Sequence, residues 1–254
     1  MSFTVFLKKE IMEIVKTTKI IILPALFLFF AVLSPLSAKY MNSILAMAGE
    51  QQGMVIKLPD PTFVQSYEQF FKNLYFMMIV VVILVFAGTA AEEKSKGTAV
   101  LVLTKCLSRT GFIMGKFIAA VSLFTLSYAV SAILCVYYTA LMFPEFINAG
   151  VVAALLIYWL FGILMIALAL FFSVLCKSLT AAVVGGFLSY AVISAVAALP
   201  GIGKYTPGAL QAFSVELARG SKTMADAVPA VVVTAILSAA AVIAGVMVFN
   251  KQEI

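Results

Sequence analysis

The chain has 254 residues, of which 64% are hydrophobic and 11% are charged, and its mean hydropathy is +1.14. A soluble domain of this length could not bury so much apolar surface, so the composition excludes an ordinary soluble protein and indicates a polytopic membrane protein. The chain contains no histidine, which excludes a Ser-His-Asp triad, a histidine-ligated zinc protease and a histidine-bound haem. We therefore do not expect an enzyme.

Residues 1–18 predict an amphipathic helix on the cytoplasmic membrane surface. Lys9, Glu13 and Lys16 lie on one face at a period near 3.6. The opposite face collects the apolar residues Phe3, Leu7, Ile11, Ile14 and Val15. A secretory signal is the alternative, but the following apolar run is too long for one, and Leu36 fits the cleavage rule badly. We expect an interface helix that leads into the first span.

Six apolar stretches are long enough to cross a hydrocarbon core about 30 Å thick as helices. Helices are expected because lipid offers the backbone no hydrogen-bond partners, and because the stretches lack the alternation of a membrane barrel. The sequence predicts an all-α membrane protein with a single domain at 19–249 and a tail at 250–254. The expected spans lie at about 19–37, 74–91, 112–142, 150–175, 178–199 and 228–249. Lys177 and Ser178 leave room only for a tight turn, which predicts an antiparallel hairpin of the fourth and fifth spans.

The distribution of charge predicts the orientation. Six spans place both termini on one side, and that side would hold eleven Lys and Arg residues against five acids, whereas the other side would hold six of each. Cations are enriched in cytoplasmic loops, so both termini are expected in the cytoplasm of a prokaryotic cell, with the spans in the plasma membrane. The basic pI of about 9.2 then requires no nucleic acid partner. The three cysteines avoid the external loops, so no structural disulfide is expected.

The expected external loop at 38–73 is rich in aromatic residues. Pro59, Asp60 and Pro61 punctuate it as a loop. Its aromatic side chains would form an interfacial belt, or alternatively a lid over an exit path. They are Tyr40, Phe63, Tyr67, Phe70 and Phe71, followed by Tyr75 at the start of the next span.

The segment at 92–116, EEKSKGTAVLVLTKCLSRTGFIMGK, is the most polar stretch between two spans. Its apolar centre, AVLVL at 99–103, is too short to cross a bilayer and too apolar to stay in water. It either rests on the lipid surface or enters a groove of a cytoplasmic partner as a short helix, and its residue pattern leaves both open. The nearby GFIMGKF at 111–117 lacks the spacing and hydroxyl of a phosphate loop, and is better read as a GxxxG packing step with an interfacial Lys116.

The order and spacing of several residues in this segment resemble the signature of type-2 ABC transporter permeases. The residues that carry the resemblance are Glu93, Gly97-Thr98, Leu101, Leu103, Thr104-Lys105, Ser108-Arg109 and Gly115-Lys116. The amino-terminal amphipathic segment, the short turn between spans four and five, and KYTPGALQAFSVELARG at 204–220 are also similar to that family. Cys106 departs from the pattern because it stands where the family usually has proline, which leaves the end of the coupling helix uncertain.

The resemblance implies a role for each matching residue. The segment would carry a coupling helix that enters a cleft of an ATPase, and Glu93 would anchor the base of the second span to that ATPase or to the interface helix. Gly97 and Thr98 would start the coupling helix, Leu101 and Leu103 would be its apolar contacts, and Arg109 would close the loop against acidic groups or phosphates. The segment at 200–227 would form an external gate, with the candidates Tyr205, Pro207 and Leu210.

The function implied by the resemblance is the permease subunit of an ATP-driven ABC exporter. Its substrate would be hydrophobic or amphiphilic (a lipid, peptide or drug), moved by alternating access. This chain would hold no cofactor, metal or catalytic residue, because ATP and Mg would bind a separate ABC ATPase subunit. A second copy or a paralogue would complete the transporter, in contact with membrane lipid. The alternatives are an assembly or recruitment subunit, and a secondary transporter, which the lack of ionisable residues in the middle of the spans disfavours.

Overall fold

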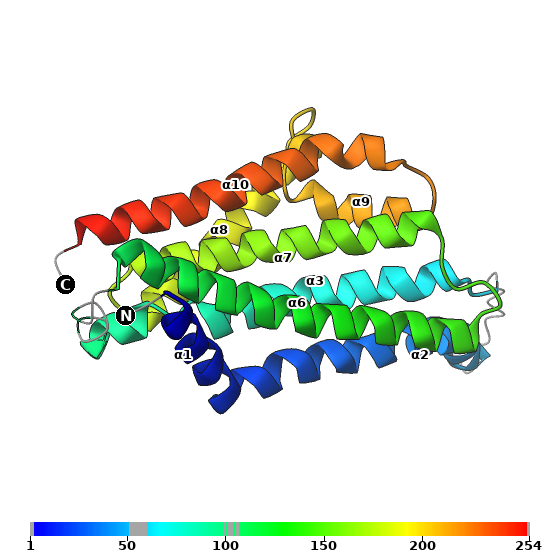
Figure 1. The fold of residues 1–254 in the computed structure, drawn as a ribbon. Coiled ribbons are helices and arrows are strands. Elements are labelled where there is room, and N and C mark those ends of the chain that lie inside the picture. Colours follow the sequence, from blue (N-terminus) through cyan, green and yellow to red (C-terminus); the bar gives the residue numbers. More distant parts are fainter. Residues whose placement is uncertain (1–2, 51–59, 99, 101–103, 105–106, 253–254) are drawn as a thin grey trace.

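The computed structural model of the chain describes residues 3–50, 60–98, 100, 104 and 107–252, with the side chains of 42–50 and 78 left out. These residues form helices and their connections, as the sequence predicts for an all-α protein. Figure 1 shows long helices running side by side, with the two termini at the same end of the bundle.

Six helices are long and apolar enough to cross a membrane, which agrees with the six expected spans. They are α2 (Lys19–Glu50, with its candidate span at Lys19–Met41), α3 (Phe63–Phe86) continued by α4 (Ala91–Ser95), α6 (Arg109–Met142), α7 (Ala149–Leu175), α8 (Leu179–Ala197) and α10 (Met224–Lys251). Three shorter helices complete the described fold: α1 (Phe3–Lys16), the single turn η1 (Gly203–Tyr205) and α9 (Ala209–Ala218).

The tight hairpin between the fourth and fifth spans is present. Helix α7 ends at Leu175, and α8 begins at Leu179 and packs against it. The side chain of Ser178 accepts a hydrogen bond from the backbone N–H of Ala181 at 3.3 Å, which caps the first turn of α8. The intervening residues Cys176 to Ser178 leave no room for anything but reversal of the chain.

The second span differs from its prediction, because it begins at Phe63 instead of near residue 74. Much of the expected loop at 38–73 is therefore helical, and three of its aromatic residues lie in the core instead of forming an interfacial belt or a lid. Tyr67, Phe70 and Phe71 are fully buried in the core, and the Tyr67 hydroxyl donates to the carbonyl of Phe146 at 2.6 Å. Average hydropathy missed this turn of helix because polar residues share it with the aromatic face.

The core of the bundle is built around α3 and α7, where aromatic rings stack between helices. The rings of Tyr128 and Tyr158 lie 5.7 Å apart, and those of Phe71 and Tyr158 lie 5.6 Å apart. Gly162 makes this packing possible, since a Cβ there would lie 2.1 Å from the ring of Phe124. Helices α8 and α10 by contrast leave most of their residues exposed.

Candidate functional site

Helix α1 docks on α6 through a face centred on Phe6 and Glu10, both of which are buried. The ring of Phe6 packs on Phe112 at 5.5 Å, and a Cβ on Gly115 would lie 2.7 Å from Phe6. The GxxxG step thus serves helix packing, as predicted, and its partner is α1. Phe3, Ile11 and Val15 of the expected apolar face are exposed, and a separate, buried face that contacts α6 carries Glu10.

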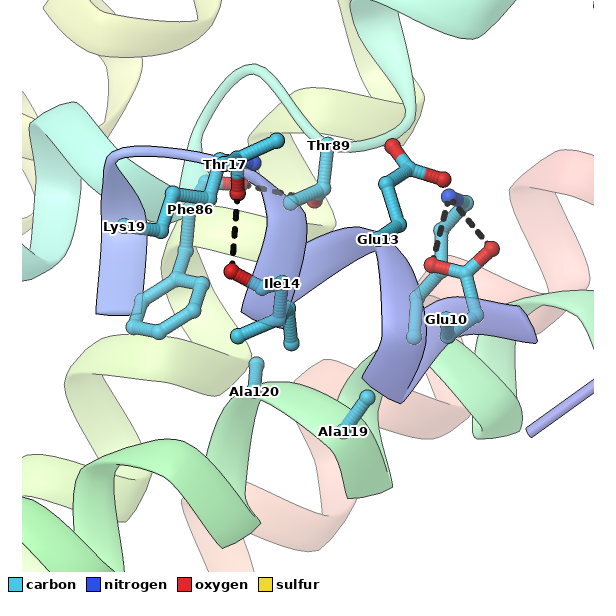
Figure 2. Close-up of a pocket in the computed structure, with 10 residues that line it drawn as sticks. Glu10, Glu13, Ile14, Thr17, Lys19, Phe86, Thr89, Ala119 and Ala120 are labelled. Atoms are coloured by element: carbon cyan, nitrogen blue, oxygen red, sulfur yellow. Dashed lines mark hydrogen bonds and ion pairs between the residues drawn. The ribbon is translucent and has the colours of Figure 1, made fainter. Parts of the chain in front are cut away.

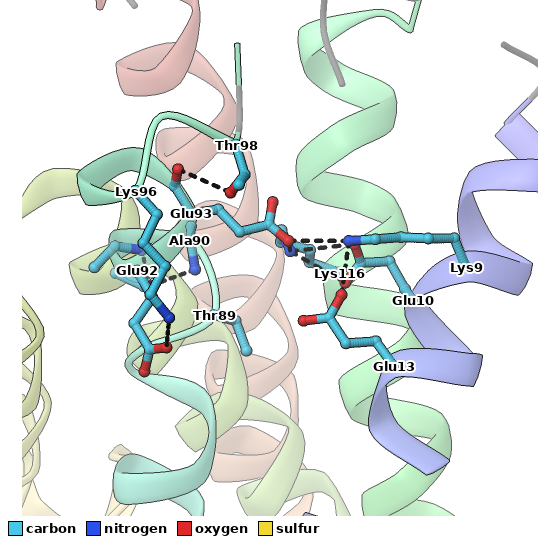
Figure 3. A network of polar contacts seen from close by, with 12 residues as sticks. Lys9, Glu10, Glu13, Thr89, Ala90, Glu92, Glu93, Lys96, Thr98 and Lys116 are labelled. Atoms are coloured by element: carbon cyan, nitrogen blue, oxygen red, sulfur yellow. Dashed lines mark hydrogen bonds and ion pairs between the residues drawn. The ribbon is translucent and has the colours of Figure 1, made fainter. Parts of the chain in front are cut away.

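Five charged residues from three helices form a network at this end of the bundle, shown in Figure 3. Lys116 of α6 lies 3.1 Å from Glu10 of α1 and 3.0 Å from Glu93 of α4. Lys9 of α1 lies 2.9 Å from Glu10, 2.7 Å from Glu13 and 3.0 Å from Glu93. The Lys116 and Glu10 side chains are only 2% and 7% exposed. The network therefore joins the amino-terminal helix to the ends of the second and third spans.

The two lysines bind an oxygen of each of the three carboxylates in this network. Oxygens of Glu10, Glu13 and Glu93 lie within 4.8 Å of one another, as metal ligands do, but ammonium groups of Lys9 and Lys116 already bind them. Burial opposes the charge of Lys9, yet its hydrogen bond to Glu13 and the charges of Glu10 and Glu93 outweigh this effect and raise the pKa of Lys9. In the same way, Lys9 outweighs the burial of Glu13 and lowers its pKa. The arrangement fits an ionic joint between helices better than a metal centre.

Glu93 lies in α4, directly before the connection between α4 and α6, which contains the predicted coupling helix. It contacts α1 through Lys9, and its second oxygen, Oε2, is buried with no hydrogen-bond partner among the described residues. Gly97 follows α4 with φ +69, a left-handed conformation that suits glycine at the end of a helix. The chain is helical again at Thr98 and Val100, and the Thr98 hydroxyl donates to the carbonyl of Glu93 at 3.2 Å. Glycine and threonine thus lie at the junction between two helical segments.

The beginning of the connection between α4 and α6 is bound to the end of α7. The Lys94 ammonium donates to the carbonyl of Val174, to that of Cys176 at 3.0 Å and to the side chain of Gln252 at 3.4 Å. The Ser173 hydroxyl accepts from the backbone N–H groups of Ala90 and Ala91 at 2.9 and 3.0 Å. A cation at the carbonyl end of a helix is stabilising because it meets the negative end of the helix dipole.

The end of the connection between α4 and α6 is bound to the end of α10. One guanidinium nitrogen of Arg109 donates to the carbonyls of Phe249, Asn250 and Gln252 at 3.2, 2.8 and 2.7 Å. These partners are backbone carbonyls at a helix end, whereas the resemblance implies acidic groups or phosphates. Next to Arg109, the Ser108 hydroxyl accepts from the backbone N–H of Gly111 at 3.0 Å and caps α6. Lys94 and Arg109 therefore perform matching tasks at the two ends of the connection.

The remaining coupling residues cannot be placed. Leu101, Leu103 and Cys106 lie outside the described residues. Of the apolar centre, Val100 is described, and it is exposed. The backbone N–H of Thr104 donates to the carbonyl of Val100 at 2.9 Å, the spacing of a helical turn.

The external gate candidates lie at the opposite end of the bundle from the charged network. Tyr205 ends η1 and is exposed, whereas Pro207 and Leu210 are buried. Helix α9 packs against α3 and α7, and a Cβ on Gly150 would lie 1.9 Å from the carbonyl oxygen of Leu217. Of the candidates that the structure describes, Glu93, Gly97, Thr98 and Arg109 thus lie at one end of the bundle, and the gate candidates lie at the other (Figure 1).

Comparison with known proteins gives the family of the chain. The family described as "Protein of unknown function (DUF2705)" matches residues 29–254, which is most of the chain. The chain belongs to this family. It is also 27% identical over 203 residues, 79% of each chain, to a protein of Bacillus subtilis (strain 168) called "Uncharacterized transmembrane protein YxlG". For this DUF2705 protein the comparison agrees with a membrane location. The matched range contains Glu93, Arg109 and Lys116, and it begins after α1.

Sequence reasoning missed several residues of this site. The sequence pattern predicts a membrane-interface role for Lys116 and gives no role to Glu10 or Ser173. One signal was available, because an acid at position 10 falls four residues after Phe6 and so shares its helical face. The sequence pattern gave no indication that Lys94 contacts the end of α7, eighty residues further along the chain.

Proposed function

We propose that this DUF2705 protein is the permease subunit of an ATP-driven ABC exporter. In this proposal the connection between α4 and α6 enters a cleft of a separate ABC ATPase, which binds ATP and Mg. Closure of two ATPase domains would then move the spans as rigid bodies and switch the side to which the substrate path opens. A second copy of the chain, or a paralogue, supplies the other half.

One observation supports the proposal most: each end of the connection between α4 and α6 is bound to a span that it does not itself belong to. Lys94 holds the end of α7, Arg109 holds the end of α10, and Glu93 binds α1 and α6. A loop that merely rested on lipid would need no such attachments. A force on the connection would reach four helices through charged hydrogen bonds, and this is the property that a coupling element requires.

The orientation belongs to the same proposal. Both termini lie at the end of the bundle that holds the charged network (Figures 1 and 3). We place this end in the cytoplasm of a prokaryotic cell, where the positive-inside rule puts it and where an ATPase can reach it. Helix α1 would then lie along the inner membrane surface, with its exposed Phe3, Ile11 and Val15 in contact with lipid.

The proposed substrate class is hydrophobic or amphiphilic. A cavity of about 530 Å³ lies between α7, α8 and α10 within their membrane-spanning lengths. Its lining is almost entirely apolar; the hydroxyl of its one serine, Ser189, donates to the carbonyl of Gly186 in its own helix. A sugar or an inorganic ion would find no partners there, whereas a lipid tail, an apolar peptide or a drug would.

Co-purification of this chain from its native membrane, with detection of any ABC ATPase that accompanies it, tests the proposal. The wild type should bring down the ATPase, and its ATP hydrolysis should depend on the permease. A Leu101→Asp, Leu103→Asp variant should lose the ATPase while still folding, because charges in an apolar contact cost several kcal/mol each. The matched control is Leu156→Asp, Ile133→Asp, two exposed positions far from the connection, which should leave ATPase binding intact in detergent.

The alternatives predict other results. A recruitment subunit would bind the ATPase, but substrate would not change the rate of hydrolysis or appear inside inverted vesicles. A secondary transporter would show no ATPase association, and transport by it would follow an ion gradient. If the double variant binds the ATPase unchanged, the apolar centre is not the contact and the proposal is wrong.

A further inference from the structure

A polar cavity lies beside the charged network, at the ends of two candidate spans. It has a volume of about 400 Å³, within the range of small-ligand sites. Lys19 opens the first candidate span, and the α3 and α4 residues of the lining close the second, so the cavity lies at the level where a span meets water. Its exposed rim includes Lys96. The cavity is lined by Lys9, Glu13, Lys19, Gly88, Thr89, Glu92, Glu93, Lys96 and Thr98.

The charges of the lining balance, but two of its groups are left without partners. Three lysines face three glutamates, so the cavity carries no net charge. Lys9 and Lys96 are in ion pairs, whereas Lys19 makes none within the described part of the chain. Figure 2 shows Lys19 at the start of α2, close to Thr17 and Thr89 in the smaller cavity that shares this lysine. The buried Glu93 Oε2 is the second group, since no described residue donates to it.

These two groups specify the ligand by their chemistry. An unpaired ammonium calls for an anion, and an unpaired carboxylate oxygen calls for an N–H or O–H donor, since polar groups left unsatisfied away from water are costly. A net anion would satisfy only Lys19 and would be repelled by the three glutamates. A quaternary ammonium headgroup has a phosphate but no N–H donor for Glu93. A primary ammonium joined to a phosphate supplies both.

We propose that this cavity binds the headgroup of phosphatidylethanolamine from the adjoining membrane leaflet. The phosphate would lie against Lys19, and the ammonium would donate to Glu93 Oε2. The lipid tails would run beside α2 into the bilayer. Such a lipid would join α1, α2 and α4 at the joint that Lys9 and Lys116 already form, and the proposal does not depend on the ATPase.

Native mass spectrometry of the purified, delipidated protein tests this proposal. The probes are lipids with identical chains: phosphatidylethanolamine, its N-methyl and N,N-dimethyl derivatives, phosphatidylcholine and phosphatidylglycerol. The N-methyl and N,N-dimethyl derivatives keep an N–H donor and should still bind, whereas phosphatidylcholine has none and should bind about ten-fold more weakly, as loss of one charged hydrogen bond predicts. Phosphatidylglycerol should bind no better than phosphatidylcholine.

Two variants assign the site. Lys19→Gln should weaken the binding of phosphatidylethanolamine, because it removes the contact to the phosphate, whereas Lys16→Gln, at the exposed end of α1 and outside the cavity lining, should bind it as the wild type does. Both variants should elute as monodisperse protein, because neither lysine is in an ion pair of the described structure. Free phosphoethanolamine at the same concentration should not displace the lipid, since the tails contribute to binding.

Four results would overturn the proposal. A flat affinity across the methylation series would mean that water satisfies Glu93. Binding of phosphatidylglycerol as tight as that of phosphatidylethanolamine, or tighter, would mean that the site is only a cationic surface. Equal losses in Lys16→Gln and Lys19→Gln would place the lipid elsewhere, and full displacement by phosphoethanolamine would make the ligand a soluble one.

Discussion

The ammonium of Lys116 lies 3.0 Å from a carboxylate oxygen of Glu93, so the third span is bound to the end of the second at the point where the connection between them begins. The same lysine lies 3.1 Å from Glu10, and its side chain is only 2% exposed. A cation withdrawn from water this far is tolerated because two carboxylates neutralise it. Helix α1 is therefore held by an ionic joint in addition to its apolar contacts.

Lys116→Met should lower the free energy of unfolding by up to about 3–5 kcal/mol, because it removes one of the two cations that neutralise the buried Glu10 and leaves only Lys9 beside it. The double variant Lys116→Met, Glu10→Leu should recover part of this loss, since it removes both charges. Thermal and denaturant unfolding in detergent measure both. Lys222→Met, which breaks an exposed pair with Glu216, is the control and should cost less than about 1 kcal/mol. A single variant as stable as that control would contradict the buried joint.

Arg109→Gln should release the last turn of α10, because three carbonyls lose their charged donor. Amide hydrogen exchange in the last turn of α10 should quicken about ten-fold or more, since charged hydrogen bonds contribute about 1.5–3 kcal/mol. Arg109→Lys should keep most of the protection, because a single nitrogen makes all three contacts and an ammonium has three donors. Equal exchange in wild type and Arg109→Gln would show that the contacts do not hold the helix end.

Gly150→Ala should destabilise the packing of α7 against α9 by about 1–3 kcal/mol, as overpacking does. The new Cβ would meet the backbone oxygen of Leu217 at 1.9 Å, and backbone cannot turn aside as a side chain does. Gly245→Ala is the matched control, because the nearest atom to its Cβ lies 3.8 Å away. Alanine in that helix interior should be neutral or stabilising by roughly 0.5–1 kcal/mol. The melting temperature of Gly150→Ala should lie below that of Gly245→Ala, and equal melting temperatures would contradict the close packing at Gly150.

The ion pair of Lys9 and Glu13 should give a difference in stability that depends on pH. The pKa of Glu13 is lowered in the fold from 4.5, so its contribution is present above about pH 4.5 and is lost as the pH falls through the folded pKa. Wild type should therefore be more stable than Glu13→Gln at neutral pH, by about 0.5 kcal/mol for a half-exposed pair. The two melting curves should converge in acid. A difference that grows as the pH falls would contradict this assignment.

In a single protein, the pH dependence of stability also contains the contributions of the other carboxylates, so the two proteins have to be compared. Glu10 and Glu93 are present in both proteins, and they contact the same Lys9 and Lys116. The difference between wild type and Glu13→Gln therefore isolates Glu13. On the alkaline side the raised pKa of Lys9 keeps its contribution intact below the unfolded value of 10.5, so no loss is expected near neutral pH.

The sequence by itself determined the fold class and the number of spans. Lipid forces backbone groups to pair within each segment, and stretches of sufficient apolar length can only be helices, so composition was enough for that conclusion. The tight turn at Ser178 was equally readable, because two residues between spans leave one geometry. The start of the second span was not, since Phe63 to Phe71 hide an aromatic face among polar residues that an average over the window dilutes.

Only the tertiary structure decided the candidate site. The sequence predicts an interfacial lysine at Lys116 and no role for Glu10, because a helix pattern shows which residues share a face but not what that face meets. The same limit applies to Lys94 and Arg109, whose partners are backbone carbonyls at the ends of α7 and α10. Backbone carbonyls are the same in every sequence, so contacts of this kind exist only once the helices have been placed side by side.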